Sequence, residues 1–507
     1  MPPSGLLSRQ QVGGWKVSLA TERGTAQWHG RTHGRRNRAP PVHGSATHIP
    51  PVTNLAQMGP VDVAIVGGGA SGTLVAVQLL RRARGPFRIA LIERSGALAR
   101  GLAYGPAEPC HVLNVPAGGM SAFPDDPGHF VGWSGAAPDA FVPRALYGKY
   151  LEAALTAAHA RAAPGVTLHL VRGEVVSAGA GRGAVHLALR AGGAIEARAA
   201  VVALGNLASA DLPVPDGGLY STLLYRRSPW DPGALDGVAP DGSVLLVGSG
   251  LTMVDAALAL RQRGHRGTIH ALSRHGLLPQ VHEEATGSAQ PRIGASGVRG
   301  LLRALRTAAR RAGDWRAAFD ALRPVAQRIW SRLSHEERRR FLRHLRPHWD
   351  VHRHRMAPDV GAAIGGLLER GQLRVHAGRV QSFAADGASA AALYRPRGER
   401  QTRELRVARV INCTGPAAQL RDARHPLLKS ILAQGLARPD ALGMGLSTDQ
   451  HGALLGGAGG LLFTLGTLRR GELWETTAIP ELRSQAVAVA QRLLDDLALP
   501  LAAEAIL

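Results

Sequence analysis

Short apolar runs that end at glycine-rich turns are the main pattern along this chain. One run, residues 63–66, leads into Gly67-Gly68-Gly69-Ala70-Ser71-Gly72, and another, residues 244–247, leads into Gly248-Ser249-Gly250-Leu251-Thr252. Apolar positions at helical spacing follow each turn, so each segment predicts a strand, a tight turn and a helix. In such a unit the backbone N–H groups at the helix N-terminus receive a phosphate. The pattern therefore predicts two dinucleotide-binding sites.

The first turn has all the features of such a site. Gly67 permits the tight turn, Gly69 lets the backbone approach the phosphates, and Gly72 lets the helix pack closely on the strand. A second apolar strand, residues 89–92, ends at Glu93, where an acid can hydrogen-bond the ribose hydroxyls. We therefore assign FAD to this site, with Ser71 among the residues that hold it.

The second turn differs at its third glycine and at its acid. Met253 takes the place of the glycine, and the next strand, residues 268–272, ends in Ser273-Arg274. A guanidinium there can pair with a 2′-phosphate, so this site is assigned to NADPH, with NADH left open because the choice rests on one arginine. The alternative is that Arg274 is a solvated residue of an Arg-rich protein. The candidate residues of this site are Gly248, Gly250, Thr252, Ser273 and Arg274.

Two such sites in one chain indicate electron transfer from a nicotinamide to a flavin. We expect an α/β fold of two Rossmann-like dinucleotide-binding domains, with the NAD(P) domain inserted in a discontinuous FAD domain. The expected boundaries are 61–240 for the first part of the FAD domain, 241–404 for the NAD(P)H domain and 405–507 for the rest of the FAD domain. In particular, residues 410–415 are expected to return to the FAD domain. An Arg-rich helical insertion is expected at 295–370.

Composition restricts the possible partners. The net charge is +23, but Lys occurs only at 16, 149 and 429, and the arginines gather in 299–355 at helical spacing. This pattern is typical of solvated helix faces, and no zinc-knuckle or aromatic stacking motif accompanies it, so we expect no nucleic-acid partner.

No apolar run is long enough to span a membrane. Residues 1–60 are predicted to be disordered or not native, with Met58 as an alternative start.

The cysteines exclude one class of enzyme with paired dinucleotide sites. Cys110 and Cys413 are the only two, and they form no C-x-x-C pair, so the dithiol of a disulfide reductase is missing. Such low cysteine usage fits a reducing cytoplasm.

Several longer motifs resemble a bacterial family of FAD/NAD(P)-binding flavoproteins that includes the FAD-dependent urate hydroxylase. The similarity covers essentially 61–490, and its motifs lie at 67–73, 101–104, 113–117, 120–121, 250–255, 273–279, 349–355 and 474–483. Cofactor-binding candidates outside the two turns are Asn114, Met120, Ser121, Gly205, Gly415, Gly466, Thr476 and Thr477.

The resemblance implies an NAD(P)H- and O₂-consuming monooxygenase that hydroxylates urate to 5-hydroxyisourate. An anionic, planar substrate calls for Arg, His and amide side chains near the flavin. The catalytic candidates are Arg100, Asn206, His282, Arg353 and His354. Three alternatives remain: N- or S-oxygenation of another small substrate, an NAD(P)H:flavin oxidoreductase without oxygen insertion, and a basic scaffold protein with a structural flavin.

Overall fold

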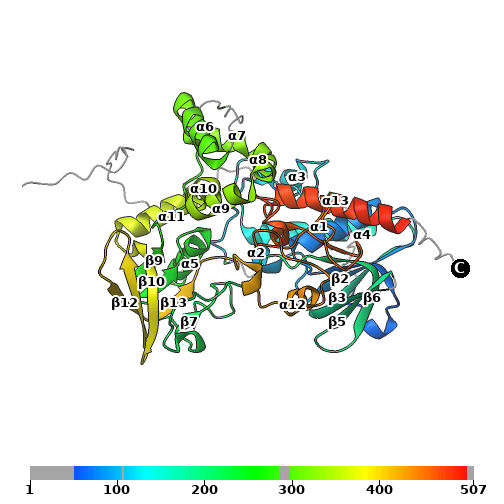
Figure 1. Ribbon diagram of the computed structural model, residues 1–507, viewed down its shortest axis with the longest axis horizontal. Helices are drawn as coiled ribbons and strands as arrows, with labels where there is room; N and C mark the ends of the chain where they lie inside the picture. Colours follow the sequence, from blue (N-terminus) through cyan, green and yellow to red (C-terminus); the bar gives the residue numbers. More distant parts are fainter. Residues whose placement is uncertain (1–50, 106–107, 182, 285–288, 290–296, 499–507) are drawn as a thin grey trace, which may run out of the picture. The chain divides into compact units, whose positions relative to one another are not determined.

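Two sheets of similar design organise the chain (Figure 1). The computed structural model describes residues 51–105, 108–181, 183–284, 289 and 297–498, all within the compact unit of residues 45–507. Residues 1–50, on which most of the expected N-terminal extension falls, lie outside the described part. Among the described residues, no helix has the length and apolarity that a membrane span requires.

The first sheet has a parallel part and an antiparallel part. Its strands, in spatial order, are β3 (Val166–Arg172), β2 (Phe87–Glu93), β1 (Val61–Val66), β6 (Ala194–Val202), β5 (Ala184–Leu189) and β4 (Val175–Gly181), with β14 (Leu462–Thr464) also paired to β6. β1, β2, β3, β6 and β14 are parallel, and β4, β5 and the start of β6 form an antiparallel meander.

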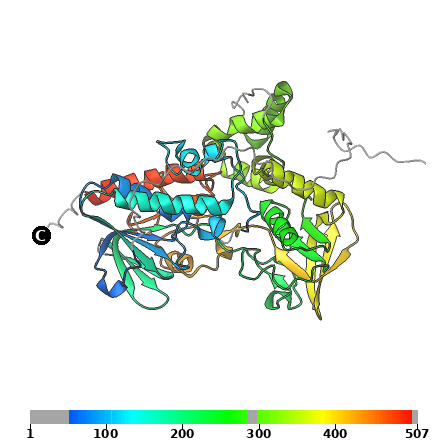
Figure 2. The ribbon, with the colours of Figure 1, turned by 180° about the vertical axis from the view of Figure 1, so that it is seen from behind.

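Helices cover this sheet and make its apolar core. α1 (Ala70–Arg82) lies beside α4 (Arg144–Ala160) and α13 (Ile479–Ala498), as the front and back views both show (Figure 2). α12 (Pro426–Ala433) packs on β4. Because β1 is covered on both faces, its residues are almost uniformly buried, which explains its continuous apolar run.

The second sheet repeats this plan. Its order is β12 (Arg403–Val407), β11 (Ser389–Pro396), β10 (Leu373–Asp386), β9 (Ile269–Ser273), β8 (Val244–Val247), β13 (Arg409–Asn412) and β7 (Tyr225–Arg226). β10, β9, β8, β13 and β7 pair in parallel, and β11 and β12 extend β10 as a meander. α5 (Leu251–Gln262) and α11 (Pro358–Glu369) contact each other beside this sheet.

A group of helices follows β9. It consists of α6 (Gly297–Ala312), α7 (Trp315–Leu322), α8 (Ala326–Arg332), α9 (His335–His344) and α10 (Arg346–Arg353). The shorter elements of the chain are α2 (Gly101–Tyr104), α3 (His129–Ser134), η1 (Leu55–Gln57), η2 (Ala117–Gly119), η3 (Leu219–Ser221), η4 (Arg323–Val325), η5 (Leu420–Asp422) and η6 (Gly466–Arg469).

The expected fold class is confirmed, and three details of the expected organisation need correction. Along the chain, the strands of the first sheet both precede and follow those of the second. The part that carries the second sheet (the second unit) is therefore inserted in the part that carries the first sheet (the first unit). However, β13 pairs with β8 and β7, so the expectation that 410–415 return to the first sheet is wrong. β7 lies in the second sheet although it precedes residue 241. The helical insertion ends before α11, which contacts α5 and β10 and connects β9 to β10.

Candidate functional site

The first glycine turn is closed tightly on the neighbouring strand. Gly67 has φ +109°, and a Cβ there would overlap the carbonyl oxygen of Ala203, just past the end of β6. A Cβ at Gly72 would overlap the carbonyl oxygen of Gly67, so only glycine lets α1 begin this close to β1. Gly69 is the N-cap of α1 and makes no side-chain cap, which leaves the first backbone N–H groups for a ligand.

Glu93 stands where a ribose-binding acid is expected. Its Oε2 accepts a hydrogen bond from the backbone N–H of Gly68 at 2.9 Å, and its Oε1 accepts from the N–H and the hydroxyl of Ser95. The end of β2 is thereby tied to the glycine turn of β1. The carboxylate lies beside the cradle that the turn forms.

Three residues from the late part of the chain gather near Ser71 at the start of α1. A Cβ at Gly466, which has φ +70°, would lie 3.6 Å from Ser71 Oγ. Gln485 of α13 accepts a hydrogen bond from the N–H of Gly466 at 3.0 Å and donates to Thr476 Oγ1 at 2.8 Å. The structure thus brings Ser71, Gly466 and Thr476 together, whereas Thr477 is exposed.

The second glycine turn has a more open cradle. Gly248 has φ +119°, and a Cβ there would lie 2.5 Å from the carbonyl oxygen of Cys413. A Cβ at Gly250, the N-cap of α5, would meet nothing within 4 Å. The turn is braced by Ser249, whose hydroxyl donates to the carbonyl oxygen of Leu277 at 2.6 Å and lies 2.7 Å from Ser273 Oγ. Thr252 lies in the first turn of α5.

Four exposed arginines gather near the end of β9. Arg274 follows Ser273, which pairs with Ala377 of β10. The carbonyl oxygen of Ala377 accepts from the N–H of Arg397, and Arg379 and Arg395 are partners across β10 and β11. Among the described residues, none of these four guanidinium groups forms an ion pair. The pKa of His275 is lowered, first by burial and then by the charges of Arg397, Arg274, His348 and Arg379.

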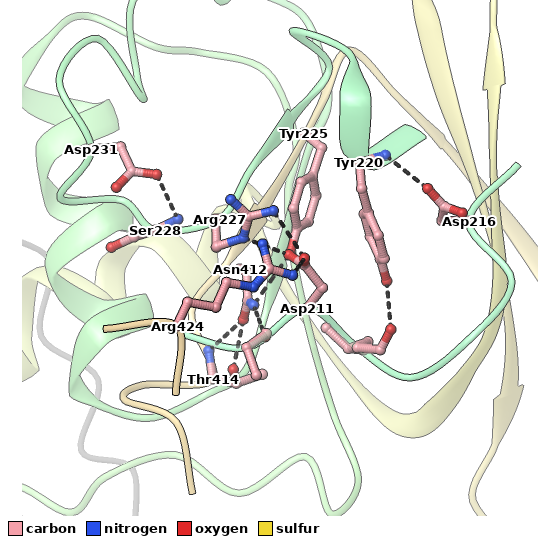
Figure 3. Close-up of polar contacts among 12 residues, drawn as sticks. Asp211, Asp216, Tyr220, Tyr225, Arg227, Ser228, Asp231, Asn412, Thr414 and Arg424 are labelled. Carbon is pink, nitrogen blue, oxygen red and sulfur yellow. Dashed lines mark hydrogen bonds and ion pairs between the residues drawn. The ribbon is translucent and has the colours of Figure 1, made fainter. Parts of the chain in front are cut away.

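Two segments connect the sheets, and Asp211 fastens one to the other (Figure 3). Its carboxylate accepts hydrogen bonds from Tyr225 of β7, from Arg227 directly after β7, and from Arg424 of the returning segment at 2.8 Å. Asn412 adds a bond from Nδ2 to the carbonyl oxygen of Ala210 at 2.9 Å. Each segment begins directly beside a glycine turn, because Ala203 adjoins Gly67 and Cys413 adjoins Gly248.

The remaining cofactor candidates have distinct surroundings. The carbonyl oxygen of Asn114 lies 3.0 Å from Nε2 of His282, so these two candidates are brought together. Met120 is buried, and the Ser121 hydroxyl donates to the carbonyl oxygen of Asp126 and accepts from the N–H of Phe123, which stabilises their loop. A Cβ at Gly205 or at Gly415 would meet nothing within 4 Å.

The catalytic candidates do not form one cluster. Asn206 accepts a hydrogen bond from the Thr467 hydroxyl, next to Gly466. Arg100 forms an ion pair with Glu152 of α4 at 3.1 Å. Burial lowers the pKa of His282, while its contact with the carbonyl oxygen of Asn114 acts in the opposite direction.

Arg353 and His354 both lie against Glu475. Arg353 Nε is 3.1 Å and His354 Nε2 is 3.9 Å from the carboxylate, which also accepts from Trp349 Nε1 at 2.7 Å. The Glu475 side chain is 7% exposed, and its φ of +60° is unusual for a non-glycine residue. Trp330 Nε1 adds a bond to the carbonyl oxygen of Gly471. The inserted helices are therefore attached to the loop that leads into α13.

Three residues that hold these sites together were not predicted from the sequence: Gln485, Glu475 and Arg397. Gln485 lies between Leu482 and Ala486 on the apolar face of α13, and a buried amide at such a position is a usable signal. Glu475 and Arg397 have no such signal, because their partners lie on other elements.

Comparisons with known proteins agree with this architecture. Residues 64–207 match a family model described as FAD-NAD(P)-binding, so this part of the chain is an FAD/NAD(P)-binding domain. No curated protein matches the chain in sequence.

Three solved structures are similar over most of the chain. An ornithine N-hydroxylase from Kutzneria sp. 744 has 14% identity and a TM-score of 0.61, and the match covers 86% of this chain and 100% of that chain. The ornithine hydroxylase of Pseudomonas aeruginosa has 16% identity and a TM-score of 0.61, with 86% of this chain and 100% of that chain covered. The L-lysine 6-monooxygenase of Pseudomonas syringae has 15% identity and a TM-score of 0.59, with 86% of this chain and 99% of that chain covered. At this level of identity they show a shared fold. Nothing in these similarities supports the expected urate hydroxylase.

Proposed function

We propose that this protein is an FAD-dependent, NADPH-consuming monooxygenase that transfers one oxygen atom to a nitrogen of a small amine. The observation that carries the proposal is the pair of glycine turns, each at the carboxyl end of an interior parallel strand of its own sheet. The overall reaction converts substrate, NADPH, H⁺ and O₂ into oxygenated substrate, NADP⁺ and water. Bound FAD, reduced by NADPH, supplies the oxygen-activating chemistry.

The first glycine turn is the proposed FAD site. The free N–H groups at the start of α1 suit a pyrophosphate, and Glu93 lies where a ribose would be bound. Ser71, Gly466 and Thr476 lie together at the same helix start, and they are proposed to surround the flavin end of the cofactor.

The second glycine turn is the proposed NADPH site. The open space above Gly250 admits a pyrophosphate, as Gly-x-Gly turns require. The exposed arginines beside Ser273 favour a 2′-phosphate, because guanidinium groups bind phosphate through paired hydrogen bonds. Arg274 and Arg397 are the proposed ligands of that phosphate.

The substrate is proposed from the similar structures. All three reported structures are described as hydroxylases or monooxygenases of ornithine or lysine, so an amine is favoured over urate. Arg100, Arg353 and His354 were expected to receive an anion, but each lies against a carboxylate. Urate is therefore the second substrate to test, and only the sequence motifs support it.

The test is rapid-mixing reduction of the purified yellow protein by NADPH, followed by oxygen-dependent product analysis with ornithine, lysine, small aliphatic amines and urate. We expect one hydroxylamine formed per NADPH with one of the amines. Loss of urate matched to NADPH would instead establish urate hydroxylation. NADPH oxidation that yields only peroxide with every substrate would identify an oxidoreductase without oxygen insertion. No reduction by NADPH or NADH would refute the proposed enzyme class.

A further inference from the structure

A buried ion pair joins the helix of the second glycine turn to the first unit. The guanidinium of Arg144, the first residue of α4, pairs with the carboxylate of Asp255 in α5 through both terminal nitrogens. The distances are 2.8 Å from Nη1 to Oδ2 and 3.2 Å from Nη2 to Oδ1. The two side chains are only 17% and 10% exposed. Two parallel hydrogen bonds fix the orientation of the guanidinium relative to the carboxylate as well as the distance between them.

The segment before α4 reinforces this contact. Glu108 pairs with Arg263 at 2.6 Å, and the N–H of Cys110 donates to Gln262 Oε1 at 3.2 Å. His111 Nε2 lies 3.1 Å from the carbonyl oxygen of Asp255. Asp255 and Gln262 are about two helical turns apart on one face of α5, and Arg263 caps its C-terminal end. Residues 108–112 therefore form a strap across that face.

The strap and the ion pair are parts of one network. The N–H of Arg144 donates to the carbonyl oxygen of His111, and its Nε donates to that of Val112. Arg144 is thus fixed by the strap before it reaches Asp255. Burial raises the pKa of Asp255, and the charge of Arg144 opposes that shift. A buried ion pair adds little stability compared with apolar residues of similar size, whereas its geometry is demanding.

We propose that Arg144 and Asp255 are positioning residues that hold α5, and with it the NADPH cradle at Gly250, in the placement from which NADPH reduces FAD. The inference rests on the proposed function. In this step two electrons and one proton pass from NADPH to FAD, which leaves NADP⁺ and reduced flavin. Asp255 lies about one helical turn from the start of α5, so a tilt at Asp255 displaces the cradle directly. Transfer between two bound groups is sensitive to displacements of about 1 Å.

The test measures anaerobic reduction of the FAD-loaded protein in Asp255→Asn and in Arg144→Met/Asp255→Leu. The double variant removes both buried charges, so it guards against loss of folding in the single variant. We expect both to lower the limiting rate of reduction by NADPH at least about tenfold, with the Kd for NADPH changed less than about threefold. A small synthetic dihydronicotinamide, which does not need the second cradle, should reduce every variant at the wild-type rate.

Arg266→Ala is the matched control, because Arg266 pairs with Asp241 on the surface of the second unit. It should leave both rates unchanged. The proposal is overturned if the limiting rate in the variants stays within twofold of wild type, or if the small donor slows in parallel with NADPH. A purely structural role would lower flavin content and slow both donors alike. If wild type itself is not reduced by NADPH or NADH, the proposed function fails first and this inference falls with it.

Discussion

At the scale of single residues, we expect the arginines near β9 to decide which nicotinamide is preferred. Arg274→Ala and Arg397→Ala should each raise the KM for NADPH by about 10- to 100-fold, because a charge-assisted hydrogen bond contributes about 1.5–3 kcal/mol. The KM for NADH should stay unchanged, since NADH lacks the 2′-phosphate. Steady-state kinetics with both nucleotides measure this difference.

Arg403→Ala is the control for these variants. Arg403 lies on β12 of the same meander but pairs with Glu399, so its loss should leave the preference intact. Equal effects of Arg274→Ala on NADPH and NADH would show that Arg274 is a solvated residue and not a phosphate ligand.

The glycines of the two cradles should respond differently to an added methyl group. Gly250→Ala should keep the thermal stability and the FAD content of wild type, because its Cβ meets nothing within 4 Å. It should nevertheless weaken NADPH binding about tenfold or more, since the methyl group occupies the approach to the pyrophosphate. Gly72→Ala should prevent stable folding or FAD binding, because its Cβ overlaps the carbonyl oxygen of Gly67.

Thermal melting, flavin absorbance and NADPH titration separate these outcomes. Unchanged NADPH affinity in Gly250→Ala would contradict the assignment of the second cradle.

At the scale of elements, Glu475 attaches the inserted helices to the loop before α13. Glu475→Gln keeps an acceptor for Trp349 but leaves the Arg353 guanidinium without a charge partner, and Arg353 is only 14% exposed. Removal of one partner from a buried pair costs about 3–5 kcal/mol. We expect a lower melting temperature and faster proteolytic cleavage within residues 297–353.

Glu336→Gln is the comparison for this variant. The Glu336 side chain is 81% exposed beside Arg340, so its change should alter stability by less than about 0.5 kcal/mol. Equal melting temperatures and cleavage rates in the two variants would show that Glu475 does not anchor the helices.

At the scale of the whole molecule, buried and half-buried histidines should make stability depend on pH. Burial lowers the pKa of many of them, and it lowers the pKa of His270 to about 4. The histidines with lowered pKa are His111, His129, His169, His265, His270, His275, His282, His352, His376 and His425.

The sign follows from proton uptake. Below about pH 6.5 the unfolded chain binds protons that the folded chain does not, so stability is full above that pH and falls as the pH drops toward 4. Carboxylates with lowered pKa, such as Asp211 and Glu174, keep their contribution down to about pH 5, because that is above their pKa in the unfolded chain. We expect the melting temperature to fall steadily from pH 7.5 to pH 5. His270→Gln should flatten this dependence, and a level profile in wild type would refute the explanation.

Local sequence determined the two glycine turns, their strands and helices, and the acid at the end of β2. These features depend on contacts between residues close in the chain, on the period of apolar residues and on the backbone freedom of glycine. The insertion of one unit in the other also followed, because the two patterns and the late strand 462–464 occur in a fixed order along the sequence.

Only the tertiary structure decided which apolar strand joins which sheet and which charges meet. β13 and β14 are both short and buried throughout, and their pairing depends on long-range contacts, so the sequence could not place residues 410–415. Arg353 and Glu475, or Arg144 and Asp255, lie more than a hundred positions apart in the sequence, and their side chains come together only after the elements pack. The fold class was therefore set by local periodicity, whereas the proposed phosphate ligands, anchors and positioning residues were set by packing.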